Sequence, residues 1–123
     1  MRADKKGFTL IELLIVLVVL GILAAIVVAK FTSFKEQAYV ASMKADLRNL
    51  AVYQMNYHLE SQGSFFSGNG AAQGFVATPG VTVNAVYVAG PPPTWSATAV
   101  HSQTPRTCVI ETSGPSVWEI SCP

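Results

Sequence analysis

Residues 8–29 read FTLIELLIVLVVLGILAAIVVA, and this run decides how the rest of the chain is organised. About 20 consecutive apolar residues are enough for a helix to cross the hydrocarbon core of a bilayer. Only Thr9, Glu12 and Gly21 interrupt the apolar composition of the run. An ionisable side chain inside such a segment costs about 3 kcal/mol on insertion scales. The sequence therefore predicts a membrane-spanning helix in which Glu12 needs a partner.

The charge of the chain is unevenly distributed. The chain has 123 residues, so one small domain remains once the apolar run is set aside. Its first seven residues are net positive, whereas from residue 8 onward five basic residues face six acidic ones. Because no basic patch follows, no nucleic-acid partner is expected. A positive segment marks the cytoplasmic side of a membrane helix, which predicts that everything after Lys30 lies on the far side.

Residues 1–7, MRADKKG, have the composition of a targeting segment. In a secretory signal peptide, the cleavage site would lie near Ala24, Ala25 or Ala29, but the apolar run is longer than the roughly 7–15 residues of such signals. An uncleaved membrane anchor is the other plain alternative. Length and composition alone leave both interpretations open.

The junction Lys5-Lys6-Gly7-Phe8-Thr9-Leu10-Ile11-Glu12 resembles the processing site of type IV prepilins. It combines a short basic leader, a glycine before an aromatic residue, and a glutamate four residues further on, all at the start of an apolar helix. The resemblance covers residues 1–45 well. It implies that a membrane peptidase removes the leader, residues 1–7, by cutting after Gly7, and that the same enzyme methylates the new amino terminus on Phe8.

The same resemblance implies where the protein acts and with what. The expected partners are the prepilin peptidase and methyltransferase, an assembly machinery with a motor ATPase, and further copies of the chain in a helical filament. The expected location is the inner membrane before assembly and an extracellular pilus afterwards. Cell adhesion, twitching motility and DNA uptake are the activities that such a filament makes available.

Two roles are open for Glu12. Cutting after Gly7 leaves a cationic amine on Phe8, which can pair with Glu12 within one helix at the i, i+4 spacing. Alternatively, the amine of an incoming copy neutralises Glu12 of a neighbour, and the resemblance favours this pairing as a device that sets the assembly register. In the other role, Thr9-x-x-Glu12 is a capping box in which the glutamate only binds a backbone N–H group. The two roles are compatible.

The helix is expected to continue far beyond the membrane, over residues 8–60. Glycine costs about 1 kcal/mol in a helix relative to alanine, and the resemblance marks Gly21 as a position where the helix loosens in the filament. Ala29 stands where such pilins often carry proline, so no proline kink is expected. Residues 30–60 contain neither proline nor glycine, and one apolar face recurs at helical spacing: Val40, Met43, Leu47, Leu50, Tyr53 and Tyr57. Polar surface is expected at Lys35, Glu36, Lys44, Asp46, Arg48 and Asn49.

Residues 61–123 are expected to form a globular head. Residues 61–80 contain five glycines, which predicts an irregular connection held to the head by Phe65, Phe66 and Phe75. Alternating or strand-like runs follow at residues 81–88, 94–101, 107–112 and 117–122. Together they predict an antiparallel sheet laid on the amphipathic half of the helix, an α+β pilin fold.

The last two strands carry both cysteines of the chain. With a turn at residues 113–116, Cys108 faces Cys122, and the paired residues Ile110 and Ile120 share a face. This register also places Glu111 opposite Glu119. Two like charges in this position repel each other, so we expect both side chains to be exposed to solvent. In an exported domain the two cysteines are expected to form a disulfide, and many type IV pilins resemble the chain in this respect.

Catalytic and metal sites find no support in the sequence. His58 and His101 are far apart, and no cysteine or carboxylate spacing is typical of a metal site. We therefore expect a structural protein without a cofactor, the major subunit of a type IV pilus, rather than an enzyme.

Three alternatives remain open. One is a minor pilin, and another is a type II secretion pseudopilin. Major pseudopilins typically lack this disulfide and bind calcium through an acidic C-terminal loop, whereas only Glu111 and Glu119 are acidic after Glu60. The most distant alternative is a single-pass membrane-anchored binding domain that keeps residues 1–7.

Overall fold

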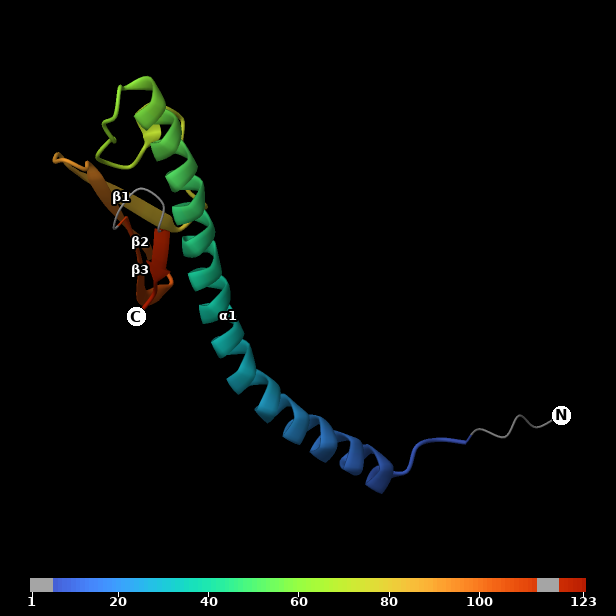
Figure 1. The fold of residues 1–123 in the computed structure, drawn as a ribbon. Helices are drawn as coiled ribbons and strands as arrows, with labels where there is room; N and C mark the ends of the chain where they lie inside the picture. The colour runs from blue at the N-terminus through green and yellow to red at the C-terminus, as the bar shows by residue number, and fades with distance from the viewer. Residues whose placement is uncertain (1–5, 113–117) are drawn as a thin grey trace. The chain divides into compact units, whose positions relative to one another are not determined.

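A computed structural model describes residues 6–112 and 118–123, and it consists of one long helix followed by a four-stranded sheet (Figure 1). The predicted α+β fold is confirmed. The chain divides into two compact units, Met1–Lys35 and Glu36–Pro123. The elements, in order, are α1 (Leu10–Glu60), the 3-10 helix η1 (Ala71–Gln73), β1 (Val81–Val88), β2 (Thr94–His101), β3 (Thr104–Thr112) and β4 (Trp118–Ser121).

The first unit contains the apolar start of α1, which begins at Leu10 rather than at residue 8. The reason is that Thr9 caps the helix: its Oγ1 accepts the N–H of Glu12 at 3.3 Å, and its carbonyl accepts the N–H of Leu13 at 3.3 Å. Every large apolar side chain from Phe8 to Phe34 is at least 49% exposed. An 18-residue window of this helix has a mean hydropathy of 3.2, which makes it long and apolar enough to cross a bilayer.

The core of the second unit lies between α1 and the sheet. The predicted apolar face of the helix is buried at Val40, Met43, Leu47 and Leu50, and its two tyrosines pack at the edge of this core. On the sheet, every second residue points toward the helix, because side chains alternate between the two faces of a strand. The buried strand residues are Val81, Val83, Ala85, Trp95, Ala97, Ala99, Cys108 and Ile110.

The sheet is a meander in the order β1-β2-β3-β4, with every neighbouring pair antiparallel. Strands β1 and β2 have the bounds that the sequence predicts. Strand β3 begins at Thr104, three residues before the predicted start, because Thr104 still pairs with His101 across a bulge beside Val100. Strand β4 ends at Ser121, and the predicted turn at 113–116 together with Val117 lies outside the described residues.

Two polar residues of α1 are buried, and the sequence analysis was wrong about one of them. Asp46 was expected on the polar surface, but it is only 4% exposed. Its two carboxylate oxygens accept the backbone N–H of Thr78 at 2.8 Å and the hydroxyl of Thr78 at 2.9 Å. Gln54 is fully buried; its Nε2 donates to the carbonyl of Phe66 at 2.8 Å and its Oε1 accepts the N–H of Phe66 at 3.0 Å. The loop that follows α1 is thus fastened to the helix at two points.

The loop at residues 61–80 is held by aromatic side chains as predicted. Phe66 and Phe75 are buried, and Phe65 is partly buried against the core. Gly70, which precedes η1, has φ +74° and is buried, and a Cβ there would lie 3.0 Å from the Cβ of Phe75 and 3.2 Å from a methyl carbon of Leu50. Only glycine combines this left-handed conformation with so close an approach.

The same loop covers the outer edge of β1. Gly68 exchanges two backbone hydrogen bonds of 2.8 Å with Ala85, and the hydroxyl of Ser67 accepts the N–H of Tyr87 at 2.9 Å. These bonds satisfy backbone groups that an edge strand otherwise presents to solvent.

The predicted disulfide between Cys108 and Cys122 is present. The register that the sequence predicts for the last two strands is also confirmed, with Ile110 opposite Ile120 and Glu111 opposite Glu119. Cys122 follows the end of β4, so the bond ties the last residues of the chain to the buried side of β3.

We predict that Asp46→Ala lowers the free energy of unfolding by about 2 kcal/mol, because hydrogen bonds to a charged group contribute roughly 1.5–3 kcal/mol. Urea unfolding of the full chain in detergent micelles, followed by tryptophan fluorescence, measures this change. The matched control is Glu36→Ala, an exposed carboxylate on the same helix, for which we expect a change within about 0.5 kcal/mol. Equal stability of the two variants would contradict the prediction.

We also predict that Cys108→Ala/Cys122→Ala lowers the free energy of unfolding by about 3 kcal/mol, since the disulfide closes a loop of about 15 residues. The wild-type chain treated with dithiothreitol should unfold at nearly the same urea concentration as the variant. Free-thiol labelling of the untreated chain is the control, and labelling of both cysteines would show that the bond does not form.

Candidate assembly site

The predicted processing site lies in an exposed, irregular segment ahead of α1. Residues 6–9 have no helical or strand structure, and Phe8 is 83% exposed. A Cβ added to Gly7 would have no atom within 4 Å. Exposed segments without secondary structure are where peptidases cleave most readily. The peptide bond between Gly7 and Phe8 is therefore open to an enzyme.

Glu12 lies in the first turn of α1, four residues after Phe8. Its own N–H is bound by Thr9, so one half of the predicted capping box is present. Among the described residues, the Glu12 carboxylate forms neither a hydrogen bond nor an ion pair. An unpaired carboxylate is therefore surrounded by exposed apolar side chains such as Ile11 and Ile15.

In the uncut chain the nitrogen of Phe8 is part of a peptide bond and is neutral. It therefore cannot act as a counter-charge for Glu12. A cut after Gly7 would turn this nitrogen into an amine at the start of the same helix. The amine and the carboxylate would then be the two charges of an otherwise apolar surface. Each is costly in a medium of low dielectric unless it is paired.

Gly21 lies within α1, and a Cβ at this position would meet no atom within 4 Å. The helix is continuous there, and loosening at Gly21 in a filament stays a prediction. Further along the helix, the hydroxyl of Thr32 donates a hydrogen bond to the carbonyl of Ala29 at 3.0 Å, which the sequence did not predict. Such bonds from threonine to its own helix slightly weaken or bend it. The acceptor of this bond, Ala29, stands where the family resemblance implies that type IV pilins often carry proline.

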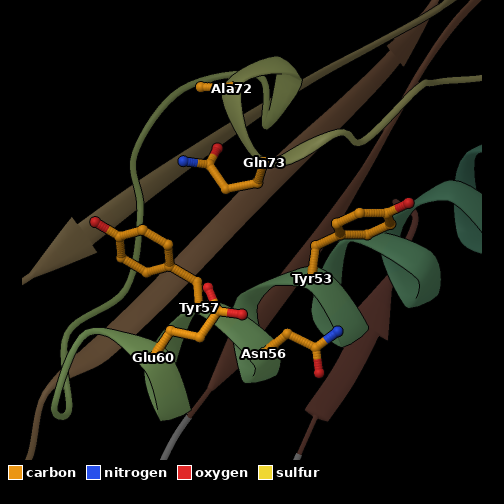
Figure 2. A pocket seen from close by; sticks show the side chains of 6 residues that line it. All are labelled: Tyr53, Asn56, Tyr57, Glu60, Ala72 and Gln73. Carbon is orange, nitrogen blue, oxygen red and sulfur yellow. The ribbon is translucent and has the colours of Figure 1, made fainter.

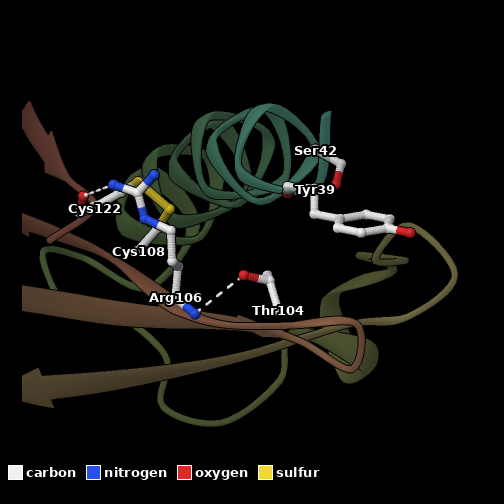
Figure 3. Close-up of a disulfide and its surroundings, with 6 residues drawn as sticks. All are labelled: Tyr39, Ser42, Thr104, Arg106, Cys108 and Cys122. Carbon is white, nitrogen blue, oxygen red and sulfur yellow. Dashed lines mark hydrogen bonds between the residues drawn. A yellow bond between two sulfur atoms is a disulfide. The ribbon is translucent and has the colours of Figure 1, made fainter. Parts of the chain in front are cut away.

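The disulfide between Cys108 and Cys122 lies beside α1, with Arg106 next to it (Figure 3). Arg106 donates from Nη2 to the carbonyl of Cys122 at 3.0 Å, and its backbone N–H is accepted by Oγ1 of Thr104 at 3.2 Å. The last residues of the chain are thus fixed both by the covalent bond and by Arg106.

One depression of about 410 Å³ lies where the last turns of α1 meet η1 (Figure 2). It is lined by Tyr53, Asn56, Tyr57, Glu60, Ala72 and Gln73. Glu60 is its one carboxylate, and no histidine or cysteine lines it. Among residues 6–112 and 118–123, no group of three or more potential metal ligands is found.

The N-terminal part of the chain matches known proteins. A family model described as the prokaryotic N-terminal methylation motif matches residues 2–28. The type II secretion system core protein G of Pseudomonas aeruginosa is 43% identical over 60 residues, which cover 49% of this chain and 42% of that protein. No solved structure matches the chain.

Two pilus proteins are also similar to the chain. The type IV major pilin protein PilA of Myxococcus xanthus is 40% identical over 56 residues, 46% of this chain and 26% of that protein. The type IV narrow pilus major component PilA5 of Thermus thermophilus is 56% identical over 45 residues, 37% of each chain. The chain thus spans less than half the length of each of these relatives. The N-terminal part of the chain is thus similar to type IV pilins and to a type II secretion core protein, and the helix-and-sheet arrangement is a pilin-like α+β fold.

Proposed function

We propose that the chain is the major structural subunit of a type IV pilus and that it has no enzymatic activity. The observation that carries the proposal is the exposed apolar start of α1 with its single unpaired carboxylate, Glu12, directly behind the methylation motif. This arrangement serves polymerisation, whereas a solitary membrane anchor gains nothing from a carboxylate at this depth.

The apolar surface of the first unit requires a covering that the unit itself does not supply. In the inner membrane, lipid covers it. Once the subunit leaves the membrane, only other apolar surfaces can do so, and the same helix of neighbouring copies is the surface available at high concentration. Burial of apolar surface stabilises by about 25 cal/mol for each Å² removed from water. A bundle of such helices is therefore a stable filament core.

Glu12 gives this bundle its register. Apolar packing between smooth helices does not fix how far one slides along another, whereas a single charge pair in low dielectric does. The amine freed on Phe8 of an incoming copy supplies the opposite charge. The partners implied are the prepilin peptidase and methyltransferase, and an assembly machinery driven by a motor ATPase, first at the inner membrane and then at the base of an extracellular filament.

A type II secretion pseudopilin is the second candidate. The match to the secretion protein of Pseudomonas aeruginosa, over 60 residues at 43% identity, favours it. The Cys108–Cys122 disulfide favours the pilus, because the family resemblance implies that major pseudopilins typically lack this bond. The scarcity of acidic residues in the head also favours the pilus, since it leaves few ligands for calcium.

We predict that the mature protein begins with methylated Phe8. The measurement is mass spectrometry of filaments sheared from cells that make the protein. Gly7→Glu is the matched variant: a bulky charged residue at the cut should keep residues 1–7 on the chain and leave the protein in the membrane. Recovery of wild-type protein that still carries Met1 and forms no filament would contradict the proposed function.

We further predict that Glu12→Ala leaves cleavage after Gly7 intact and reduces the mass of sheared filaments about tenfold or more. The reason is that an amine without a counter-charge in low dielectric costs well over the roughly 1.4 kcal/mol that a factor of ten represents.

Thr9→Ala is the control for this experiment, because it removes the observed cap bond to the N–H of Glu12 but leaves the carboxylate. If Glu12 acts in assembly, Thr9→Ala should assemble much better than Glu12→Ala. Equal losses in the two variants would assign Glu12 to helix capping instead.

A further inference from the structure

The second unit carries charges that its own fold leaves unpaired. Among the described residues of 36–123, Asp46 is bound by Thr78, and Arg106 is bound to the carbonyl of Cys122. The other acidic and basic side chains of this unit form no hydrogen bond and no ion pair there: Glu36, Lys44, Arg48, Glu60, Glu111 and Glu119. Four of these six are arranged as two like-charged pairs.

The positive pair consists of Lys44 and Arg48 on α1. The two residues are separated by one helical turn and line a groove of about 300 Å³ together with Ile110 and Ile120. Like charges at i, i+4 repel each other and destabilise a helix. No carboxylate within the described part of the chain relieves this repulsion.

The negative pair consists of Glu111 on β3 and Glu119 on β4. The two are direct cross-strand partners, and both are exposed. Like charges in this position are destabilising. Because Ile110 and Ile120 face the core side, Glu111 and Glu119 lie on the opposite face of the sheet, away from Lys44 and Arg48. The two pairs of one chain are therefore held apart by the sheet.

The spacing within the two pairs matches. Cβ atoms at i and i+4 of a helix are about 5–6 Å apart, and those of direct cross-strand partners are about 4.5–5.5 Å apart. Two cations and two carboxylates with nearly equal spacing can form two ion pairs side by side, and each contact removes two repulsions. We propose that Lys44 and Arg48 of one copy bind Glu111 and Glu119 of a second copy of this chain.

This contact joins different surfaces of the two copies, so it is heterologous, and a repeated heterologous contact that does not close generates an open helical array. The inference rests on the proposed function, because it assigns a surface through which neighbouring heads meet in the filament. Exposed ion pairs are individually weak, so the contact selects the neighbour and its orientation. The apolar helices supply the bulk of the attraction.

A zero-length carbodiimide coupling tests the contact on the full-length wild-type protein. This reagent joins an amine to a carboxylate only when the two touch. In filaments sheared from cells, the coupling should yield peptides that join Lys44 to Glu111 or Glu119. Because the sheet holds the two pairs of one chain apart, such a product joins two copies. In Lys44→Arg, which keeps the charge but lacks the amine, filaments should persist and this product should disappear.

Charge reversal supplies an independent measurement. We expect Lys44→Glu/Arg48→Glu to reduce the mass of filaments about tenfold, and Glu111→Lys/Glu119→Lys to do the same, because two attractions become repulsions. A chain with all four reversals restores the complementarity and should recover most of the filament mass. Glu60→Lys, a reversal of an exposed charge outside both pairs, is the control and should have little effect.

The outcomes separate the inference from the proposed function. Abundant wild-type filaments in which Lys44 couples only to other carboxylates, or to a different protein, would overturn the inference and leave the proposed function standing. The inference would also be overturned if the two double reversals did not lower the mass of filaments, or if the fourfold reversal did not restore it. If the correctly cleaved wild-type chain forms no filament or oligomer, the proposed function is overturned, and the contact with it.

Discussion

Helix α1 presents more apolar surface than one chain covers, and this imbalance governs the rest of the structure. Along its second part, one face is buried under the sheet and the loop that precedes it. From Leu10 to Val28, the large apolar side chains are all exposed, and Glu12 is the one charged residue among them. A surface of this kind is stable in lipid or against similar helices. The protein is consequently built to be completed by other molecules.

The head is fastened to the helix by a small number of directional bonds. Asp46 holds Thr78, which lies 32 residues away in sequence, and Gln54 holds both backbone groups of Phe66. Apolar packing alone leaves a loop free to shift over a helix, whereas these bonds specify one position. The Cys108–Cys122 disulfide likewise fixes the residues after β4 in one position against β3. A rigid head follows from these local restraints, although its apolar core is small.

Elements whose pattern is local were predictable from the sequence. Alternation predicted the bounds of β1 and β2, and the two cysteines with their intervening turn predicted the register of β3 and β4. The junction around Gly7 and Phe8 was recognisable because all of its features fall within a few residues.

The failures concern bonds between distant parts of the chain. Asp46 was placed on the surface because it is charged, even though it lies three residues after Met43 and four before Leu50, on the buried face. That spacing was the available signal; its partner, Thr78, was not predictable from any local pattern. The early start of β3 was also missed, because the pairing of Thr104 with His101 across the bulge beside Val100 depends on a partner strand rather than on a local pattern.

The bonds that Ser67 and Gly68 make to β1 bear on how such a protein survives crowding. A bare strand at the margin of a sheet invites further strands to add on, and the product of unchecked addition is cross-β aggregate. Here the backbone of Ala85 and the N–H of Tyr87 are already occupied by the loop. The edge of the sheet at β1 is therefore less open to the addition of a strand from another molecule.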